Sequence, residues 1–235
     1  MIDTSAPGGA STGSERVRVA VWDWPVRVVH WSMALLLVAL VATGLRGGDA
    51  LEWHMRFGQV LLALVLFRIL WGFVGSRNAR FRTFVRGSRA AASYVRSRVR
   101  RAPEVHATHN PIGGWMVIAL LGALLVQAGT GLVTNDDILW DGPLVKHVAK
   151  DTSDALSSFH RRFAWVVVTL AVLHVLAVIA YLVVFRENLA KAMVNGLKSL
   201  PADLADPSAA SASSLRAMAL LAACGVAVWF VLHRL

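Results

Sequence analysis

The chain has 235 residues, of which 56% are hydrophobic and only 16% are charged, and its mean hydropathy is +0.56. A soluble domain of this length is rarely so apolar, so these values favour an integral membrane protein. The net charge of +10 does not predict nucleic-acid binding, because no recognised binding motif accompanies it. The single cysteine, Cys224, excludes a disulfide framework within the chain.

Five apolar stretches are each long enough for a transmembrane helix, which needs about 20 residues. In chain order they cover residues 26–45, 53–74, 112–133, 159–185 and 215–232. Asp23 as an N-cap and Pro25 at an early helical position predict where the first helix begins. Before it, the Gly-, Ser- and Ala-rich residues 1–20 predict a disordered lead without the basic and apolar regions of a signal peptide.

The loops between these stretches differ in charge. Residues 75–111 contain nine arginines and one acid, Glu104, whereas residues 134–158 contain five aspartates and two lysines. By the positive-inside rule, the arginine-rich loop and the N-terminus are predicted to be cytoplasmic and the C-terminus periplasmic. The Pro-, Ala- and Ser-rich residues 199–214 are expected to be a linker.

Four histidines lie within or at the ends of three of the apolar stretches. His30 is near the predicted cytoplasmic end of the first stretch, and His54 is near the outer end of the second. His160 and His174 are fourteen residues apart in the fourth stretch, which places them within about 40° on one helix face and about 21 Å apart along the axis. His54 is therefore expected to face His160, and His30 to face His174.

Two facing imidazoles at one level are what haem ligation by two histidines requires. Any one histidine is also explained by hydrogen bonding or an interfacial position, but four that sort into two layers favour a functional site. Because the chain has no C-x-x-C-H motif, the haem is expected to be bound without a covalent link. His30 and His174 lie at different distances from their helix ends, so tilt or an extended fourth helix must bring them together.

Three arginines are candidates for binding haem propionates. Arg68 lies in an apolar stretch fourteen residues after His54, so it is expected at the level of His30 and His174. Arg27 is three residues before His30, on nearly the same face. Arg161, next to His160, has weaker support. Snorkelling to lipid phosphates is the alternative for Arg27 and Arg68.

Four segments together carry a resemblance to a known family: WDWPVRVVHW, FRILWGFVGSRNARF, HNPIGGW and LHVLAVIAYLVVFRENLAKAM. They resemble the prokaryotic cytochrome b561 family, which overlaps with the b-type cytochrome subunits of nickel–iron hydrogenases. The resemblance covers roughly residues 20–198. It implies an all-α transmembrane bundle of four helices with two non-covalent haems b, ligated by His30, His54, His160 and His174. Residues 21–198 are then the haem domain, and residues 215–235 are an extra transmembrane helix.

The sequence therefore predicts a multi-pass protein of the bacterial inner membrane that carries electrons between the quinone pool and a redox partner protein. Whether it also acts as a quinone-linked oxidoreductase is left open. The first alternative is a membrane-anchor cytochrome b subunit of a hydrogenase- or dehydrogenase-type complex. The others are a haem-free, histidine-lined metal transporter, for which the apolar stretches hold almost no acidic or cysteine partners, and a purely structural anchor.

Overall fold

The computed structural model describes residues 15–99 and 106–234. Over these residues the fold is helical apart from one two-stranded sheet, and five helices are long and apolar enough to cross a membrane. The expected all-α membrane fold is therefore confirmed. The five helices are α1 (Trp24–Arg46), α2 (Ala50–Val74), α5 (Pro111–Gly131), α6 (Lys150–Val183) and α8 (Ser214–Arg234).

Two of these helices begin with the same local signal. The Asp23 carboxylate accepts a hydrogen bond from the Val26 backbone N–H at 2.9 Å, and Pro25 occupies the first turn of α1. At α5, the Asn110 side chain accepts from the Gly113 N–H at 2.8 Å, again with a proline in the first turn. A side-chain oxygen satisfies one of the free N–H groups there, and proline has no N–H to lose.

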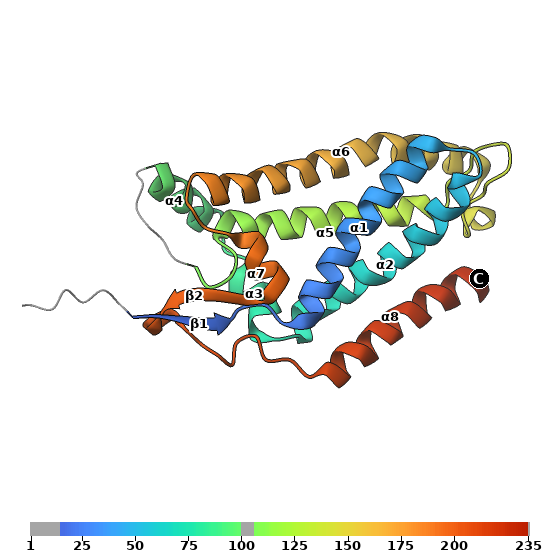
Figure 1. Ribbon diagram of the computed structural model, residues 1–235. Coiled ribbons are helices and arrows are strands. Elements are labelled where there is room, and N and C mark those ends of the chain that lie inside the picture. Colours follow the sequence, from blue (N-terminus) through green and yellow to red (C-terminus); the bar gives the residue numbers. More distant parts are fainter. Residues whose placement is uncertain (1–14, 100–105, 235) are drawn as a thin grey trace, which may run out of the picture.

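The long helices form two antiparallel pairs, α1 with α2 and α5 with α6, which meet where α2 packs against α5. Helix α8 packs against another side of α2 (Figure 1), through a small apolar cluster that includes Leu62, Val228 and Leu232. The fifth helix is thus an addition to the outside of the four-helix arrangement.

The short elements gather at one end of the bundle, here called the basic end, where the arginine-rich segment lies (Figure 1). They are η1 (Arg77–Ala79), α3 (Phe81–Phe84), α4 (Ser88–Val99), α7 (Leu189–Asn195), η3 (Ala202–Leu204) and the strands β1 (Arg16–Ala20) and β2 (Leu197–Pro201). The strands pair antiparallel, with Arg18 opposite Ser199. Val19 and Leu200 from this sheet join a buried core with α1, α2 and α8.

The sheet corrects two expectations. Residues 16–20 were expected to belong to a disordered lead and residues 199–201 to a linker, but both form strands. The alternation of Arg and Val over residues 16–19 gives β1 one buried and one exposed face, which is the pattern of a half-buried strand. Residues 1–14, the rest of the expected lead, lie outside the described part of the chain.

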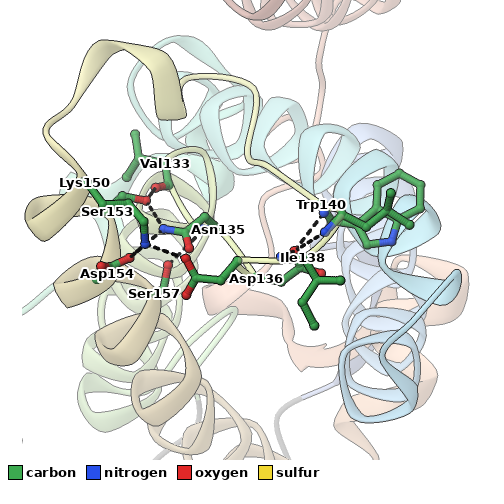
Figure 2. Close-up of polar contacts among 11 residues, drawn as sticks. Val133, Asn135, Asp136, Ile138, Trp140, Lys150, Ser153, Asp154 and Ser157 are labelled. Atoms are coloured by element: carbon green, nitrogen blue, oxygen red, sulfur yellow. Dashed lines mark hydrogen bonds and ion pairs between the residues drawn. The ribbon is translucent and has the colours of Figure 1, made fainter.

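The opposite end of the bundle, here called the acidic end, carries the aspartate-rich segment between α5 and α6, which includes η2 (Val145–His147). Figure 2 shows how this segment is tied to the first turns of α6. The Asn135 side chain donates to Ser153 and Asp154, and the Ser153 hydroxyl donates to the Val133 carbonyl at 2.7 Å. The Asn135 backbone N–H donates to the Ser157 hydroxyl at 3.0 Å.

This network explains why α6 begins at Lys150, nine residues before the predicted apolar stretch. Hydropathy locates only the part of a helix that meets lipid. The first turns of α6 are polar and are held instead by the hydrogen bonds at the acidic end.

Candidate functional site

The four histidines singled out in the sequence form two pairs at different levels of the bundle. The ring centres of His30 on α1 and His174 on α6 are 6.3 Å apart, with the ring planes at 62°. The ring centres of His54 on α2 and His160 on α6 are 6.2 Å apart, with the planes at 81°. The expected pairing is therefore the one that the structure brings together.

Both separations fit one iron atom between two imidazoles. An imidazole nitrogen binds a metal ion at about 2 Å and its ring centre lies about 1 Å further away, so two axial histidines would have ring centres about 6 Å apart. Each pair also stands alone: among the described residues, no cluster of three or more His, Cys, Asp or Glu side chains is placed to hold a metal ion. Two neutral imidazoles suit an iron whose remaining ligands come from a macrocycle.

The pair at the acidic end is oriented by hydrogen bonds to its Nδ1 atoms. Nδ1 of His54 lies 2.9 Å from the Leu40 carbonyl oxygen, which only accepts, so this nitrogen carries the proton. Nδ1 of His160 lies 3.2 Å from the Thr130 hydroxyl, whose own proton is directed to the carbonyls of α5. In both rings the lone pair is then on Nε2, the nitrogen free to bind a metal.

Two further contacts shape this pair. The Gln127 side-chain amide nitrogen lies 3.1 Å from Nε2 of His160, so the amide must turn aside when that nitrogen binds iron. Gly131 leaves room for the same ring, because a Cβ at this position would lie 2.9 Å from Cε1 of His160. At Gly129 a Cβ would meet no atom within 4 Å.

The pair at the basic end contains an unsatisfied polar atom. Nδ1 of His30 is buried and has no hydrogen-bond partner, which costs free energy that a bound ligand with a polar group would recover. The ring of His30 also meets the Trp31 ring edge-on, with centres 5.3 Å apart. A neutral imidazole with unused bonding capacity at membrane depth fits a cofactor site.

The different distances of His30 and His174 from their helix ends are absorbed by α6, which continues past the start of α1. After α6 ends at Val183, α7 returns to the first turns of α1. Arg27 there donates to the Val194 carbonyl at 2.9 Å, and Trp31 donates to the Met193 carbonyl at 3.4 Å. The chain beyond His174 therefore overhangs α1 and folds back onto it.

Arg68 is buried, with 5% of its surface exposed, and it lies close enough to His30 to interact with it electrostatically. It donates to the Ala79 carbonyl at 3.4 Å and stands over the Phe81 ring. Asp23, also buried, is its electrostatic partner and accepts a hydrogen bond from Trp71 at 2.9 Å. The sequence signal read as a helix cap thus also supplies an anion for Arg68, which sequence reasoning missed.

The other two candidate arginines lie nearer the surface. Arg27 is occupied by the α7 carbonyl described above, although its Nε is buried without a partner. Arg161 is exposed, and its nearest polar contact is the Ser158 hydroxyl at 3.4 Å. It lies close enough to His160 to interact electrostatically.

His109 is a residue near the basic-end pair that sequence reasoning left out. Its ring packs between Trp22 and Phe84, at centre distances of 4.9 Å and 4.5 Å, and its Nδ1 is buried without a partner. Burial, with the positive charge of Arg68 as the next cause, lowers the pKa of His109 to about 3. The sequence signal was its position immediately before the Asn110 cap and Pro111.

The fold and the two histidine pairs define a multi-pass helical membrane protein with paired imidazoles at two levels. The chain matches the family described as prokaryotic cytochrome b561 over residues 21–196, and it belongs to that family.

Relatives include two proteins named "Probable Ni/Fe-hydrogenase B-type cytochrome subunit". One, from Bradyrhizobium diazoefficiens, is 25% identical, with 83% of this chain and 91% of the relative aligned. The other, from Azotobacter vinelandii, is 27% identical over 83% of this chain and 95% of the relative. A "Probable Ni/Fe-hydrogenase 1 B-type cytochrome subunit" from Escherichia coli is 23% identical over 76% and 90%. No solved structure matches the chain.

Family membership and the five apolar helices confirm the general prediction. The protein is a multi-pass prokaryotic membrane cytochrome of the b type that functions in electron transport with haem b. The candidate residues fit this cofactor in the type of donor, the separation of the rings and the unsatisfied nitrogen of His30.

Proposed function

We propose that the protein binds two haems b and carries electrons from one face of the membrane to the other. His30 and His174 are the axial ligands of the basic-end haem, and His54 and His160 are those of the acidic-end haem. The observation that carries the proposal is the repetition: two pairs with ring centres 6.3 Å and 6.2 Å apart use two histidines fourteen residues apart on α6.

Each haem, when bound, supplies an iron that is reversibly reduced by one electron. The chain's own residues hold and tune it. Leu40 and Thr130 keep the protons of His54 and His160 on Nδ1, which fixes the ring orientation and strengthens the ligand. Arg68 places a positive charge at the basic-end level, balanced in part by Asp23. We assign Arg27 and Arg161 to propionate contacts at the basic and acidic levels respectively.

The proposed electron route joins quinone or quinol on one side to a redox partner protein on the other. A second candidate is a membrane-anchor cytochrome subunit of a hydrogenase-type complex, and the names of the relatives favour it. The two differ in what reduces the haems. A short-chain quinol should reduce both haems in the isolated chain if it is an independent quinone-linked carrier, whereas an anchor subunit requires its complex.

The location that we propose is the bacterial inner membrane, with the N-terminus and the basic end in the cytoplasm and the C-terminus in the periplasm. Support comes from the nine arginines of residues 75–111 against the aspartates of residues 134–158. We further assign residues 21–198 to the haem-binding unit and residues 215–235 to an added helix.

A redox titration of the purified protein, followed in the haem absorption bands, tests the ligand assignment. The wild-type protein is expected to show two midpoints. His174→Ala should remove one component and His160→Ala the other, because each variant takes one ligand from one iron. If both variants remove the same component, the division into two levels is wrong.

A further inference from the structure

A strongly basic hollow opens beside the basic end of α6, away from both histidine pairs. It has a volume of about 560 Å³, and the elements that line it, β1, β2, α4, α7 and the end of α6, meet at this end of the bundle (Figure 1). Its described lining includes six cationic side chains: Arg16, Arg18, Arg98, Arg186, Lys191 and Lys198. Among the described residues, the lining contains one carboxylate, that of Glu187, which is paired with Lys198 at 2.6 Å.

Two of the cations are held in place by uncharged groups. Arg98 donates from Nε to the Tyr94 hydroxyl at 2.8 Å and stacks over the Phe185 ring at 4.5 Å. Arg16 donates to the Ser199 carbonyl at 2.9 Å. A hydroxyl, a carbonyl or a ring face orients a guanidinium without neutralising it, so the positive charge remains available to an anion.

The backbone at Arg186 is a second, independent observation. Its φ of 56° lies in the left-handed region, which costs an L-residue energy that glycine avoids. This residue turns the chain just after α6, where the Glu187 N–H bonds the Tyr181 carbonyl at 3.0 Å. An arginine where glycine is cheaper puts a guanidinium at the rim of the hollow.

The apolar surface beside the hollow indicates what kind of anion it takes. Val183 and Val184, directly before Phe185, are 69% and 68% exposed at the end of a helix that crosses the membrane. The cations therefore begin where the lipid-facing surface ends. A concave basic site at that boundary suits a phosphate group with apolar chains attached, and its limited volume favours a head group over the flat acidic face of a protein.

We propose that this hollow binds the phosphate-bearing head group of an anionic phospholipid. Arg186, Lys191 and Arg98 provide the charge at its phosphate, and the exposed valines at the end of α6 contact its acyl chains. This inference does not depend on the number or the ligation of the haems.

The test uses the purified holoprotein in detergent, titrated with phosphatidylglycerol or phosphatidylcholine and followed by native mass spectrometry. The double variant Arg186→Gly and Lys191→Gln removes two cations, and glycine keeps the left-handed backbone, so folding is preserved. Its apparent affinity for phosphatidylglycerol should fall roughly thirtyfold, with thermal stability unchanged. The matched control, Arg82→Gln with Arg89→Gln, removes two exposed arginines of the same end that do not line the hollow, and it should bind as the wild type does.

Inorganic phosphate, added as a competitor, distinguishes a lipid from a soluble anion. Millimolar phosphate should leave the bound phosphatidylglycerol in place if the acyl chains contribute. The proposal is overturned if phosphate displaces the lipid completely, if phosphatidylcholine binds equally well, or if the double variant and its control lose the same affinity. Binding of an acidic protein at the hollow with no lipid retained would also overturn it.

Discussion

At the scale of single residues, the space around His160 depends on a glycine of α5. A methyl group at Gly131 would come within 2.9 Å of the His160 ring, whereas one at Gly129, half a turn away, would meet nothing within 4 Å. Gly131→Ala is therefore expected to displace His160 and remove the acidic-end haem component, with the other component retained. Gly129→Ala is the matched control and should keep both components in the reduced-minus-oxidised spectrum. Equal spectra for the two variants would show that Gly131 does not shape a haem site.

Arg68 and Asp23 form a buried pair of opposite charges near His30. Arg68→Leu removes a positive charge, which favours the more positive, oxidised iron, so the midpoint of the basic-end component should fall by on the order of tens of millivolts. Asp23→Asn removes the negative partner and should raise the same midpoint. Redox titration measures both shifts. A larger shift in the component that His160→Ala removes would place Arg68 at the wrong level.

Sequence reasoning at this scale found the histidines but not their supporting partners. Histidines fourteen residues apart on one helix share a face whatever the neighbouring helices do, so the pairs were predictable. The Asp23–Arg68 relationship, the Leu40 carbonyl at His54 and the overlooked His109 depend on how separate helices pack. No local pattern in the sequence reports that packing.

At the scale of elements, the polar start of α6 depends on the network in Figure 2. The Ser153 side chain, 1% exposed, donates to the Val133 carbonyl and accepts from Asn135. Ser153→Ala leaves these groups without partners and should destabilise the protein by about 1–3 kcal/mol. Thermal unfolding in detergent measures the loss, with the exposed Asp151→Ala as the control. An unchanged midpoint for Ser153→Ala would show that the network does not stabilise α6.

The spans themselves were predictable because about twenty apolar residues with few charges have one stable arrangement in lipid, a helix. The β1–β2 pair was not predicted, because its strands are about 180 residues apart in the chain and each is only five residues long. The alternating Arg and Val of residues 16–19 was the available signal. Its partner strand has no comparable alternation.

At the scale of the whole molecule, the charge difference between the two ends predicts how the chain sits in the membrane. A reporter fused near Arg96, in α4, is expected to be cytoplasmic, and one near Asp141, at the acidic end, periplasmic. Alkaline phosphatase and green fluorescent protein fusions at the two sites measure this, because each is active on one side only. The reverse pattern would put the basic-end histidine pair on the periplasmic side.

The haem content of the purified protein tests the two-level ligation most directly. A pyridine haemochrome assay against the protein concentration is expected to give two haems b per chain, all extractable with acid acetone because none is covalently attached. His174→Ala and His160→Ala should each retain one. A ratio of one haem in the wild-type chain, or haem that stays with the protein after extraction, would contradict ligation by His30 with His174 and His54 with His160.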